Sequence, residues 1–398
     1  MNKFWLLTLR VLLTGLFLFV VLALIAMARG YRLDFTKKSL SPTGILAISS
    51  LPKAAKIYIN GQLRGATDLN IELAPGTYDV EIKKDGYTSY TKKVVLKGEL
   101  VEAVDPILFP VNPSLSPITN LGVSRAVAID RSDNLLLFAS NGDVEKDGIY
   151  LFEAGRKTLN FFPPLKTLIL KSKLPFDADF QKTKIYFSYD YKQAIFEFEL
   201  LDGSPVSYLL SLDAENQEPF DVSASKNTLI NAWQEERVKE TKKLIEILPR
   251  DIRKIASDSF NVVSFSPDQT KVLYRAKNDV KLPLVIDPPL IASNQTPEQR
   301  NIKKGKVYVY DKREDKNFNV GDEKSPSFLW YVDSKRLVFN EGHRIAIILY
   351  DGQSKQIVYS GPIEKDFFTT TSDGKILILA NLNPQFNKFP DVYEVGIR

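Results

Sequence analysis

The chain of 398 residues contains no cysteine and only one histidine. The absence of cysteine excludes disulfide bonds, a thiolate nucleophile and a cysteine-based metal site. The single histidine, His343, cannot form a histidine-rich metal site, and we expect it to lie in an exposed turn between two strands. The chain also has no His-Glu-x-x-His, no phosphate-binding loop and no nucleophile elbow. The sequence therefore supports none of these classes of catalytic site.

Outside its N-terminal region the chain has little net charge. The formal net charge of +5 is accounted for by residues 1–38, in which Asp34 is the only acidic residue and the basic residues are Lys3, Arg10, Arg29, Arg32, Lys37 and Lys38. The remaining chain carries 47 basic and 47 acidic residues. Because nucleic-acid-binding domains present a basic face, this balance argues against nucleic acid as a partner.

One long apolar run stands at the N-terminus. Residues 11–27 carry no charge, and extending the run back across Arg10 to Phe4 lengthens it to about 25 residues. A membrane-spanning helix needs about 20 such residues. The sequence therefore predicts a single membrane anchor, an N-terminal tail and transmembrane helix in residues 1–30. A cleaved signal peptide is the alternative, because Ala26–Met27–Ala28 resembles a cleavage site.

Residues 31–43 form a short basic linker, and residues 44–104 show the pattern of a small β-sandwich. Asn60–Gly61 predicts a tight hairpin, since a type I′ turn needs positive φ at both central residues. Apolar residues alternate with charged ones over residues 78–83, which predicts a strand with one buried face.

Two segments of this domain resemble a known family. They are Ile57-Tyr58-Ile59-Asn60-Gly61 and Pro75-Gly76-Thr77-Tyr78-Asp79-Val80-Glu81-Ile82, the latter followed by Gly86-Tyr87. They resemble the PEGA domain, a small β-domain found mostly in bacterial and archaeal surface or envelope proteins. The resemblance implies a role as spacer, surface attachment or protein contact, and brings no catalytic residues.

Residues 105–121 form a proline-rich linker, and residues 122–398 repeat a polar turn followed by apolar strands. Six copies of the turn occur, the third of them degenerate, at residues 130–134, 180–183, 223–227, 266–271, 332–336 and 371–375. Spacing of about 40–50 residues predicts a β-propeller, with six blades favoured. In the first copy, residues 159–162 are expected to form a third strand.

The turns at Ser266–Lys271 and Ser372–Lys375 resemble the Ser-Pro-Asp-Gly-x-Lys signature of TolB-like and WD40-like propellers. The order of anchor, PEGA-like domain and propeller resembles bacterial envelope proteins. That resemblance implies a single-pass cell-membrane protein whose soluble part is extracytoplasmic, although the flanking basic residues slightly favour the opposite orientation. The last copy shows only three strands, so we expect residues between Asp105 and Gly122 to pair beside residues 392–397 and close the ring.

Two segments depart from the repeat. Residues 233–247 have a helical pattern that places Val238, Thr241, Ile245 and Leu248 on one face, and Pro249 ends it. Residues 281–304 lie between two strands of the fourth copy and are rich in proline. We expect a helix packed on the propeller and a projecting loop, respectively, and the loop is open to a binding role.

The sequence therefore favours an all-β binding or scaffolding protein without enzymatic activity, cofactor or metal, whose propeller contacts a protein or a cell-wall polysaccharide. It singles out no catalytic or binding residue. The alternative is a propeller-fold glycoside hydrolase that uses acidic residues in the channel. The candidate carboxylates for that reaction are Asp177, Asp179, Asp221, Glu364 and Asp366. Asn141–Glu145 offers a few oxygen ligands for Ca²⁺, but a polar loop is the simpler interpretation.

Overall fold

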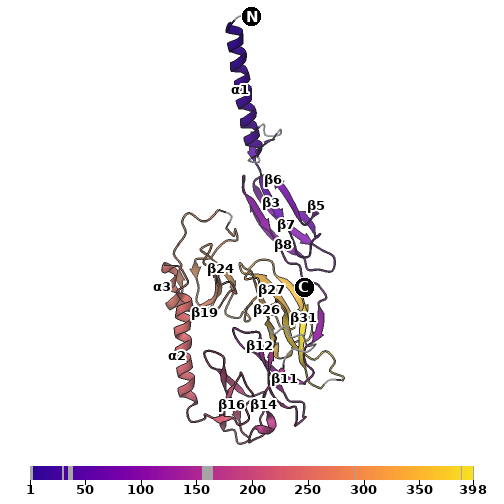
Figure 1. Ribbon diagram of the computed structural model, residues 1–398, viewed down its shortest axis with the longest axis vertical. Helices are drawn as coiled ribbons and strands as arrows, with labels where there is room; N and C mark the ends of the chain where they lie inside the picture. Colours follow the sequence, from indigo (N-terminus) through magenta and orange to yellow (C-terminus); the bar gives the residue numbers. More distant parts are fainter. Residues whose placement is uncertain are drawn as a thin grey trace. The chain divides into compact units, whose positions relative to one another are not determined.

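The computed structural model describes residues 3–28, 31–34, 39–154, 165–291, 293–386 and 388–397 (Figure 1). It divides into two compact units. The first consists of Met1–Leu108 with Leu290–Thr296, and the second of Phe109–Pro289 with Pro297–Arg398. The strand expected at residues 159–162 lies outside the described residues.

The chain begins with a long helix, α1 (Lys3–Ala28), whose side chains from residue 9 to residue 25 are mostly exposed. A membrane span needs about 20 consecutive apolar residues. Within the described part of the chain, no helix is long and apolar enough to cross a membrane. The predicted transmembrane helix is therefore not supported.

The predicted linker at residues 31–43 holds an antiparallel pair of short strands, β1 (Tyr31–Asp34) and β2 (Ser39–Pro42). In this pair, Tyr31 lies opposite Pro42 and Asp34 lies opposite Ser39. Strands of four residues are too short to show a clear alternation of apolar and polar side chains, so the sequence did not reveal them.

The PEGA-like segment folds as two sheets, as predicted. The three-stranded sheet has the order β6–β3–β9 and the four-stranded sheet the order β5–β4–β7–β8. Their bounds are β3 Gly44–Ile48, β4 Lys56–Ile59, β5 Gln62–Ala66, β6 Leu69–Leu73, β7 Gly76–Lys83, β8 Tyr90–Leu96 and β9 Val101–Val104. The hairpin turn is confirmed, with φ of 50° at Asn60 and 77° at Gly61. Val80 and Ile82 are fully buried, which confirms the predicted inward face of β7.

In the second unit the described strands pair into five four-stranded antiparallel sheets, the blades of a propeller. The first blade comprises β11 Val123–Ala128, β12 Asn134–Ala139, β13 Gly148–Glu153 and β14 Leu165–Leu170. The second comprises β15 Lys184–Phe187, β16 Gln193–Glu199, β17 Pro205–Ser211 and β18 Phe220–Asp221. The third comprises β19 Phe260–Phe265, β20 Lys271–Ala276, β23 Val307–Asp311 and β24 Lys316–Gly321. The fourth comprises β25 Leu329–Trp330, β26 Arg336–Asn340, β27 Arg344–Leu349 and β28 Gln356–Ser360.

The fifth blade takes its fourth strand from the other end of the unit. It comprises β29 Phe368–Thr370, β30 Ile376–Ala380, β31 Asp391–Gly396 and β10 Ser114–Pro117. β10 runs antiparallel to β31, with Ser114 opposite Gly396. This confirms the predicted closure by residues between Asp105 and Gly122. The closing strand covers an edge that would otherwise be unpaired.

The blades follow one another around a ring, held together by apolar clusters. Phe138 of the first blade and Phe196 of the second share one cluster, and Leu137 and Leu379 join the first blade to the fifth. A further cluster, which contains Leu273 and Leu337, joins the third blade to the fourth. Between β29 and β25, the hydroxyl of Thr370 donates to the carbonyl of Trp330 at 3.1 Å. The first strands of the fourth and fifth blades therefore lie next to each other.

A pair of helices lies between the second and third blades. α2 (Lys226–Ile245) runs from the region of β16 to α3 (Arg250–Ser259), which leads into β19 (Figure 1). The degenerate third copy of the repeat thus forms the start of α2, and the described strands form five blades, so the prediction of six blades is not confirmed. Residues 226–245 carry mostly helix-forming charged and straight-chain side chains, which do not suit a strand.

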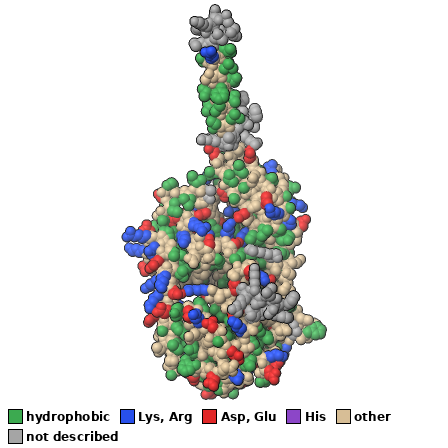
Figure 2. Space-filling view, in the orientation of Figure 1, with side chains coloured by type: hydrophobic (Ala, Val, Ile, Leu, Met, Phe, Trp, Pro, Cys, Tyr) green, Lys and Arg blue, Asp and Glu red, His purple; other side chains and the backbone are tan. Residues whose placement is uncertain are grey.

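The buried face of α2 also differs from the prediction. Ile245 and Leu248 are buried as expected, but Val238 is exposed. The neighbouring Arg237 turns inward instead, because its guanidinium donates to the carbonyl of Phe187 at 2.7 Å and lies over the ring of Tyr191. Figure 2 shows basic and acidic side chains intermingled over α3 and the adjoining end of α2, so the outer face of this helix pair is solvated and mixed in charge.

The ring has two ends, which we name from their connections. The turn face is formed by the turns between the first and second strands of the blades, at residues 129–133, 188–192, 266–270, 331–335 and 371–375. Since neighbouring strands are antiparallel, the loops that lead into the first strands lie at the other end. This loop face includes residues 118–122, 171–183, 322–328 and 361–367.

The proline-rich segment at residues 281–304 interrupts the third blade between β20 and β23, as predicted. Its base is a short ladder of β21 (Val280–Lys281) and β22 (Asn301–Ile302), and its tip, Leu290–Thr296, groups with the first unit. Both sides of the segment are held to the blade by polar contacts. The carboxylate of Asp315 accepts hydrogen bonds from the N–H groups of Val285 and Ile286, and it pairs with Arg300 at 3.0 Å. Except at its tip, the segment is thus an integral part of the third blade.

Candidate functional site

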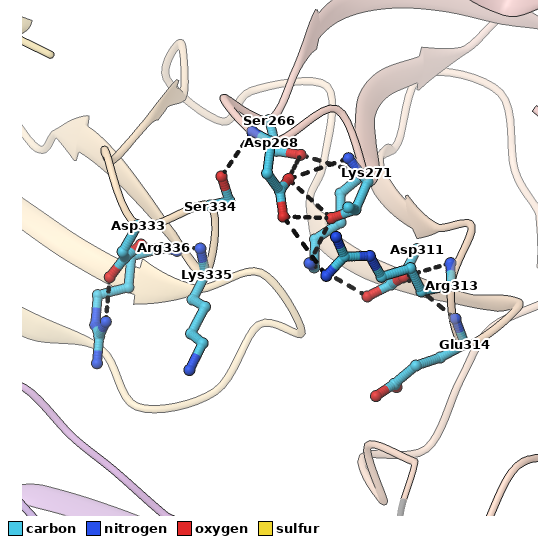
Figure 3. Close-up of polar contacts among 11 residues, drawn as sticks. Ser266, Asp268, Lys271, Asp311, Arg313, Glu314, Asp333, Ser334, Lys335 and Arg336 are labelled. Atoms are coloured by element: carbon cyan, nitrogen blue, oxygen red, sulfur yellow. Dashed lines mark hydrogen bonds and ion pairs between the residues drawn. The ribbon is translucent and has the colours of Figure 1, made fainter. Parts of the chain in front are cut away.

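The sequence signature at Ser266–Lys271 forms a closed polar network on the turn face (Figure 3). The carboxylate of Asp268 accepts hydrogen bonds from the hydroxyl of Ser266 at 2.7 Å and from the backbone and hydroxyl of Thr270. Burial raises the pKa of Asp268, but the hydrogen bonds from Ser266 and Thr270 and the charge of Lys271 outweigh it and bring the pKa to about 2. Lys271 itself is buried against Asp311 at 3.4 Å. These polar groups are satisfied within the fold.

Contacts between turns link the blades in sequence around the turn face. The N–H of Asp268 in the third blade donates to the hydroxyl oxygen of Ser334 in the fourth at 3.0 Å. The hydroxyl of Tyr331 in the fourth blade donates to the carbonyl of Gly374 in the fifth at 2.9 Å. Figure 3 shows Ser334 reaching toward Asp268 from its own turn.

The chain of contacts continues through the fifth and first blades. Ser372 bonds the carboxylate of Asp133 through its N–H and its hydroxyl, and Tyr191 of the second blade donates to Asp130 of the first at 3.1 Å. The turn signature therefore joins blades to one another.

The loop face gathers a different set of groups, which we call the loop-face cluster: Arg125, Asp179, Asn340, Glu364, Lys365 and Asp366. Arg125 on β11 donates to the carbonyl of Thr183, which precedes β15. Lys365, in the short 3₁₀ turn η2 (Glu364–Asp366) before β29, donates to the carbonyl of Ser124 at 2.8 Å. The first, second and fifth blades thus bring two cations together.

The two cations are close enough to influence each other, since Lys365 reaches the carbonyl of the residue before Arg125. Burial lowers the pKa of Arg125. Burial also lowers the pKa of Lys365, and the nearby charge of Arg125 lowers it further, while Asp179 and Glu364 partly offset both effects. Within the described residues neither cation lies within 4 Å of a carboxylate oxygen. The cluster therefore holds two neighbouring positive charges without a paired carboxylate among the described residues, and of the two side chains that of Lys365 is exposed.

Asn340, at the end of β26, extends the cluster toward the fourth blade. Its side-chain N–H group donates to the carbonyl and the carboxylate of Asp366, both at 3.3 Å. Its side-chain oxygen is buried and has no hydrogen-bond partner in the described part of the chain. A buried polar atom without a partner is uncommon and calls for a physical explanation.

The five candidate carboxylates do not form one group. Asp177 is exposed and paired with Lys171 at 2.6 Å. Asp221 lies on β18, the strand farthest from the centre in its sheet, where the N–H and hydroxyl of Ser223 lower its pKa. Asp179, Glu364 and Asp366 belong to the loop-face cluster. The structure thus brings three of the five together and separates the other two.

Other candidates show no arrangement typical of a reactive site. His343 is exposed in the turn between β26 and β27, as predicted. Asp143 accepts from the N–H of Glu145 at 3.1 Å and pairs with Lys146, as expected for a polar loop. Among the described residues no three acidic or histidine side chains are grouped to hold a metal ion. A pocket of about 220 Å³ in the first unit includes Asp68, whose carboxylate is already paired with Lys53 at 3.0 Å.

Comparison with known proteins supports the predicted PEGA-like domain in the first unit. Residues 43–105 match the PEGA domain family over the two sheets described above. The first unit contains a PEGA domain. In this PEGA domain the turn residues Asn60, Gly61 and Gly86 all have positive φ, which explains the glycine and asparagine of the matching segments. No curated protein matches the chain in sequence.

Solved structures that resemble the chain are β-propellers and proteins related to them. A putative TolB from Agrobacterium tumefaciens is 12% identical, with 62% of this chain and 66% of that chain covered and a TM-score of 0.20. TolB from Acinetobacter baumannii is 13% identical over 74% and 59%, with a TM-score of 0.17, and the Dos1 propeller is 9% identical over 92% and 81%, with a TM-score of 0.20. At these scores the likeness carries no argument about function. The propeller assignment rests on the strand pairing itself.

Sequence reasoning missed Arg125, Asn340 and Lys365. None belongs to a motif, and they lie on three different blades. Of the three, only Lys365 has a local sequence feature that could have drawn attention to it. It stands between two acidic residues directly before the first strand of a blade. Their meeting depends on closure of the ring, which a linear pattern does not display.

Proposed function

We propose that this protein is an envelope-associated binding or scaffolding protein that does not catalyse a reaction. In this proposal the propeller presents its loop face to a protein partner, and the PEGA domain spaces or attaches it in the cell envelope. The observation that carries the proposal is the contrast between the two ends of the ring. The polar groups of the turn-face signature bond within and between blades, whereas the loop-face cluster keeps two cations without ion-pair partners in the described chain and a buried acceptor without a donor.

The contrast favours binding over hydrolysis. A glycoside hydrolase needs one carboxylic acid with a raised pKa, paired across the scissile bond with a second carboxylate. Asp221 has a lowered pKa and lies on an outer strand, and Asp177 is neutralised by Lys171. The carboxyl whose pKa burial does raise is Asp391, and it accepts hydrogen bonds from Thr119, Leu121 and Gly122 at the closure of the ring. Asp391 therefore serves the fold.

Cross-linking in cells tests the proposal. A photoreactive residue placed at Asp177, an exposed position on the loop face, should cross-link to a discrete protein partner. The same residue at Lys335, exposed on the turn face, is the matched control and should give little cross-linking. Cross-links from Lys335 alone, or from neither position, would contradict the proposed binding face.

Two further measurements test location and the alternative activity. Protease added to intact cells should remove the propeller, and full protection until the cells are lysed would exclude an extracytoplasmic location. The purified protein should release no reducing ends from cell-wall glycans. Release that disappears in Asp179→Ala would show that the glycoside hydrolase is right and the binding protein wrong.

A further inference from the structure

One edge of the first unit has backbone groups that point outward. Strand β8 is the last strand of the four-stranded sheet and has only β7 as a neighbour in it. Asp79 on β7 exchanges hydrogen bonds with Asn60, so its N–H and carbonyl point away from β8. The residue opposite it in an antiparallel pair then points its own N–H and carbonyl out of the sheet. That residue is Lys93, and Thr91 and Val95 follow the same alternation.

A side-chain amide already occupies this edge at one point. The N–H of Val95 donates to the side-chain oxygen of Gln295 at 2.9 Å, and the amide nitrogen of Gln295 donates to Glu102 on β9 at 3.1 Å. Gln295 belongs to the tip, Leu290–Thr296, which groups with the first unit. A primary amide offers a carbonyl acceptor and N–H donors, as a peptide group does. Gln295 therefore stands where the backbone of an added strand would lie.

The remainder of the edge is open to solvent. Thr91, Lys93 and Val95 are all exposed, and among the described residues the N–H of Lys93 has no hydrogen-bond partner. A row of outward backbone groups on an edge strand is a template for a further strand. The hydrogen bond from Val95 to Gln295 is itself exposed. Since a single exposed hydrogen bond contributes only modestly, the carbonyl of an incoming strand can replace Gln295.

The side chains of β8 favour a strand of negative charge. β8 carries Lys92 and Lys93, Lys97 follows directly, and residues 86–98 contain no acidic residue. Lys93 lies 3.8 Å from Asp79, but both side chains are largely exposed, so this pair is weak. Lysines on an edge discourage pairing with apolar or basic strands. Acidic side chains directly opposite them are complementary.

We propose that β8 binds an extended acidic peptide segment of a partner protein, which pairs with the outward backbone groups of Lys93 and Val95 and displaces Gln295. In this mode of peptide binding, backbone hydrogen bonds supply affinity and alternate side chains supply specificity. Gln295 covers the edge while the partner is absent. The site lies in the PEGA domain, so the inference goes beyond the proposed binding face of the propeller.

Fluorescence anisotropy with the full chain tests the inference on defined probes. The first probe is a labelled peptide amide of sequence Thr-Val-Glu-Val-Glu-Val-Thr, and the second has lysine in place of both glutamates. The acidic peptide should bind about tenfold tighter, because like charges directly opposite Lys93 are destabilising. An acidic peptide that is N-methylated at alternate residues should not bind, since it lacks the donors that pair with β8.

Variants assign the binding to this edge. Gln295→Ala should tighten binding of the acidic peptide about fivefold, the value of one neutral hydrogen bond, because the competing amide is removed. Gln299→Ala, an exposed glutamine outside the tip, is the matched control and should leave the affinity unchanged. Lys93→Glu should weaken binding of the acidic peptide and strengthen that of the lysine peptide. Lys93 is exposed, so the variant is expected to fold, and circular dichroism verifies that it does.

Hydrogen exchange locates the bound peptide. The amide groups of residues 91–96 should become protected when the acidic peptide is added, while those of β5, at the opposite edge of the sheet, should exchange as before. Protection of β5 alone would overturn the inference. So would a failure of the acidic peptide to bind the Gln295→Ala variant, an affinity that Gln295→Ala leaves unchanged, or a charge preference that survives Lys93→Glu. None of these outcomes depends on the cross-linking result from Asp177.

Discussion

The N–H of Ser372 donates a hydrogen bond to the carboxylate of Asp133 at 2.8 Å, although the two residues lie 239 positions apart. They belong to the turns of the fifth and first blades. The fifth blade also contains the closing strand β10, which pairs with β31. The ring is thus closed twice, by backbone pairing in the fifth sheet and by side-chain contacts on the turn face.

Removing the side-chain contact between Asp133 and Ser372 should lower the stability of the fold. Asp133→Ala deletes both hydrogen bonds with Ser372 and should lower the free energy of unfolding by about 1 kcal/mol, because charge-assisted bonds at an exposed site contribute modestly. Urea unfolding measures the change. Asp202→Ala, which removes bonds only to Ser204 in its own turn, is the control and should cost less. Equal losses in the two variants would show that the contact between blades adds nothing.

Backbone closure is tested at Gly396. A Cβ atom at this position would collide with the side chain of Ser114 in β10. Gly396→Ala should therefore destabilise the protein by about 1 kcal/mol or less, because the Ser114 hydroxyl that the Cβ atom would meet can rotate away. Combining it with Ser114→Gly should recover part of the loss, although glycine weakens a strand. No recovery in the double variant would mean that the clash lies elsewhere than between β10 and β31.

The third blade depends on a buried ion pair. Asp315 pairs with Arg300 at 3.0 Å, and burial together with the charge of Asp315 raises the pKa of Tyr310. Asp315→Ala removes one of the two carboxylates that pair with Arg300 and the acceptor of two backbone N–H groups, so a loss of about 3 kcal/mol is expected in thermal or urea unfolding. Glu298→Gln, at the more exposed end of Arg300, should cost about 1 kcal/mol or less. Comparable losses would contradict the assigned role of Asp315.

This pair also corrects an expectation from the sequence. A projecting loop at residues 281–304 suggests that Pro283–Pro297 can be deleted without loss of folding. In the structure Arg300 donates to the carbonyl of Pro283, and Asp315 accepts from Val285 and Ile286. Deletion removes these partners from buried charges, so only the tip, Leu290–Thr296, is expected to tolerate removal.

Acid should weaken the turn of the third blade at Asp268, whose carboxylate accepts hydrogen bonds from Ser266 and Thr270. Its pKa in the folded protein is about 2, below the 3.8 of an ordinary aspartate. The stability from this lowered pKa is complete above pH 4 or so and is lost as the pH falls toward about 2. Relative to wild type, Asp268→Asn should lose about 1 kcal/mol near pH 5, a value reduced for partial exposure. The difference should shrink toward pH 2, and a difference independent of pH would contradict the account.

Much of the fold could be predicted from the sequence because the deciding signals are local. Asn60–Gly61 specifies its turn through positive φ, and β7 shows its buried face by alternation. The missing fourth strand of the last copy pointed to closure by a segment near the start of the propeller. These features depend on a few neighbouring residues, so a linear pattern displays them.

The blade count and the candidate site could not be predicted in the same way. Ser223–Asn227 resembles a blade turn, yet the twenty residues from Lys226 prefer a helix, and the ring closes with α2 beside the second blade. Arg237 holds α2 against the second blade by donating to the carbonyl of Phe187, a contact that exists only in three dimensions. Lys365 and Arg125 likewise meet only after the first and fifth blades are joined.

Hydrogen exchange of the protein with and without its cross-linked partner tests the central claim most directly. If the loop face binds the partner, the amide groups of residues 171–183 and 361–367 should become protected when the partner is added. Those of the turns at residues 266–270 and 371–375 should exchange as before. Protection confined to the turn face, with the loop face unchanged, would contradict the account.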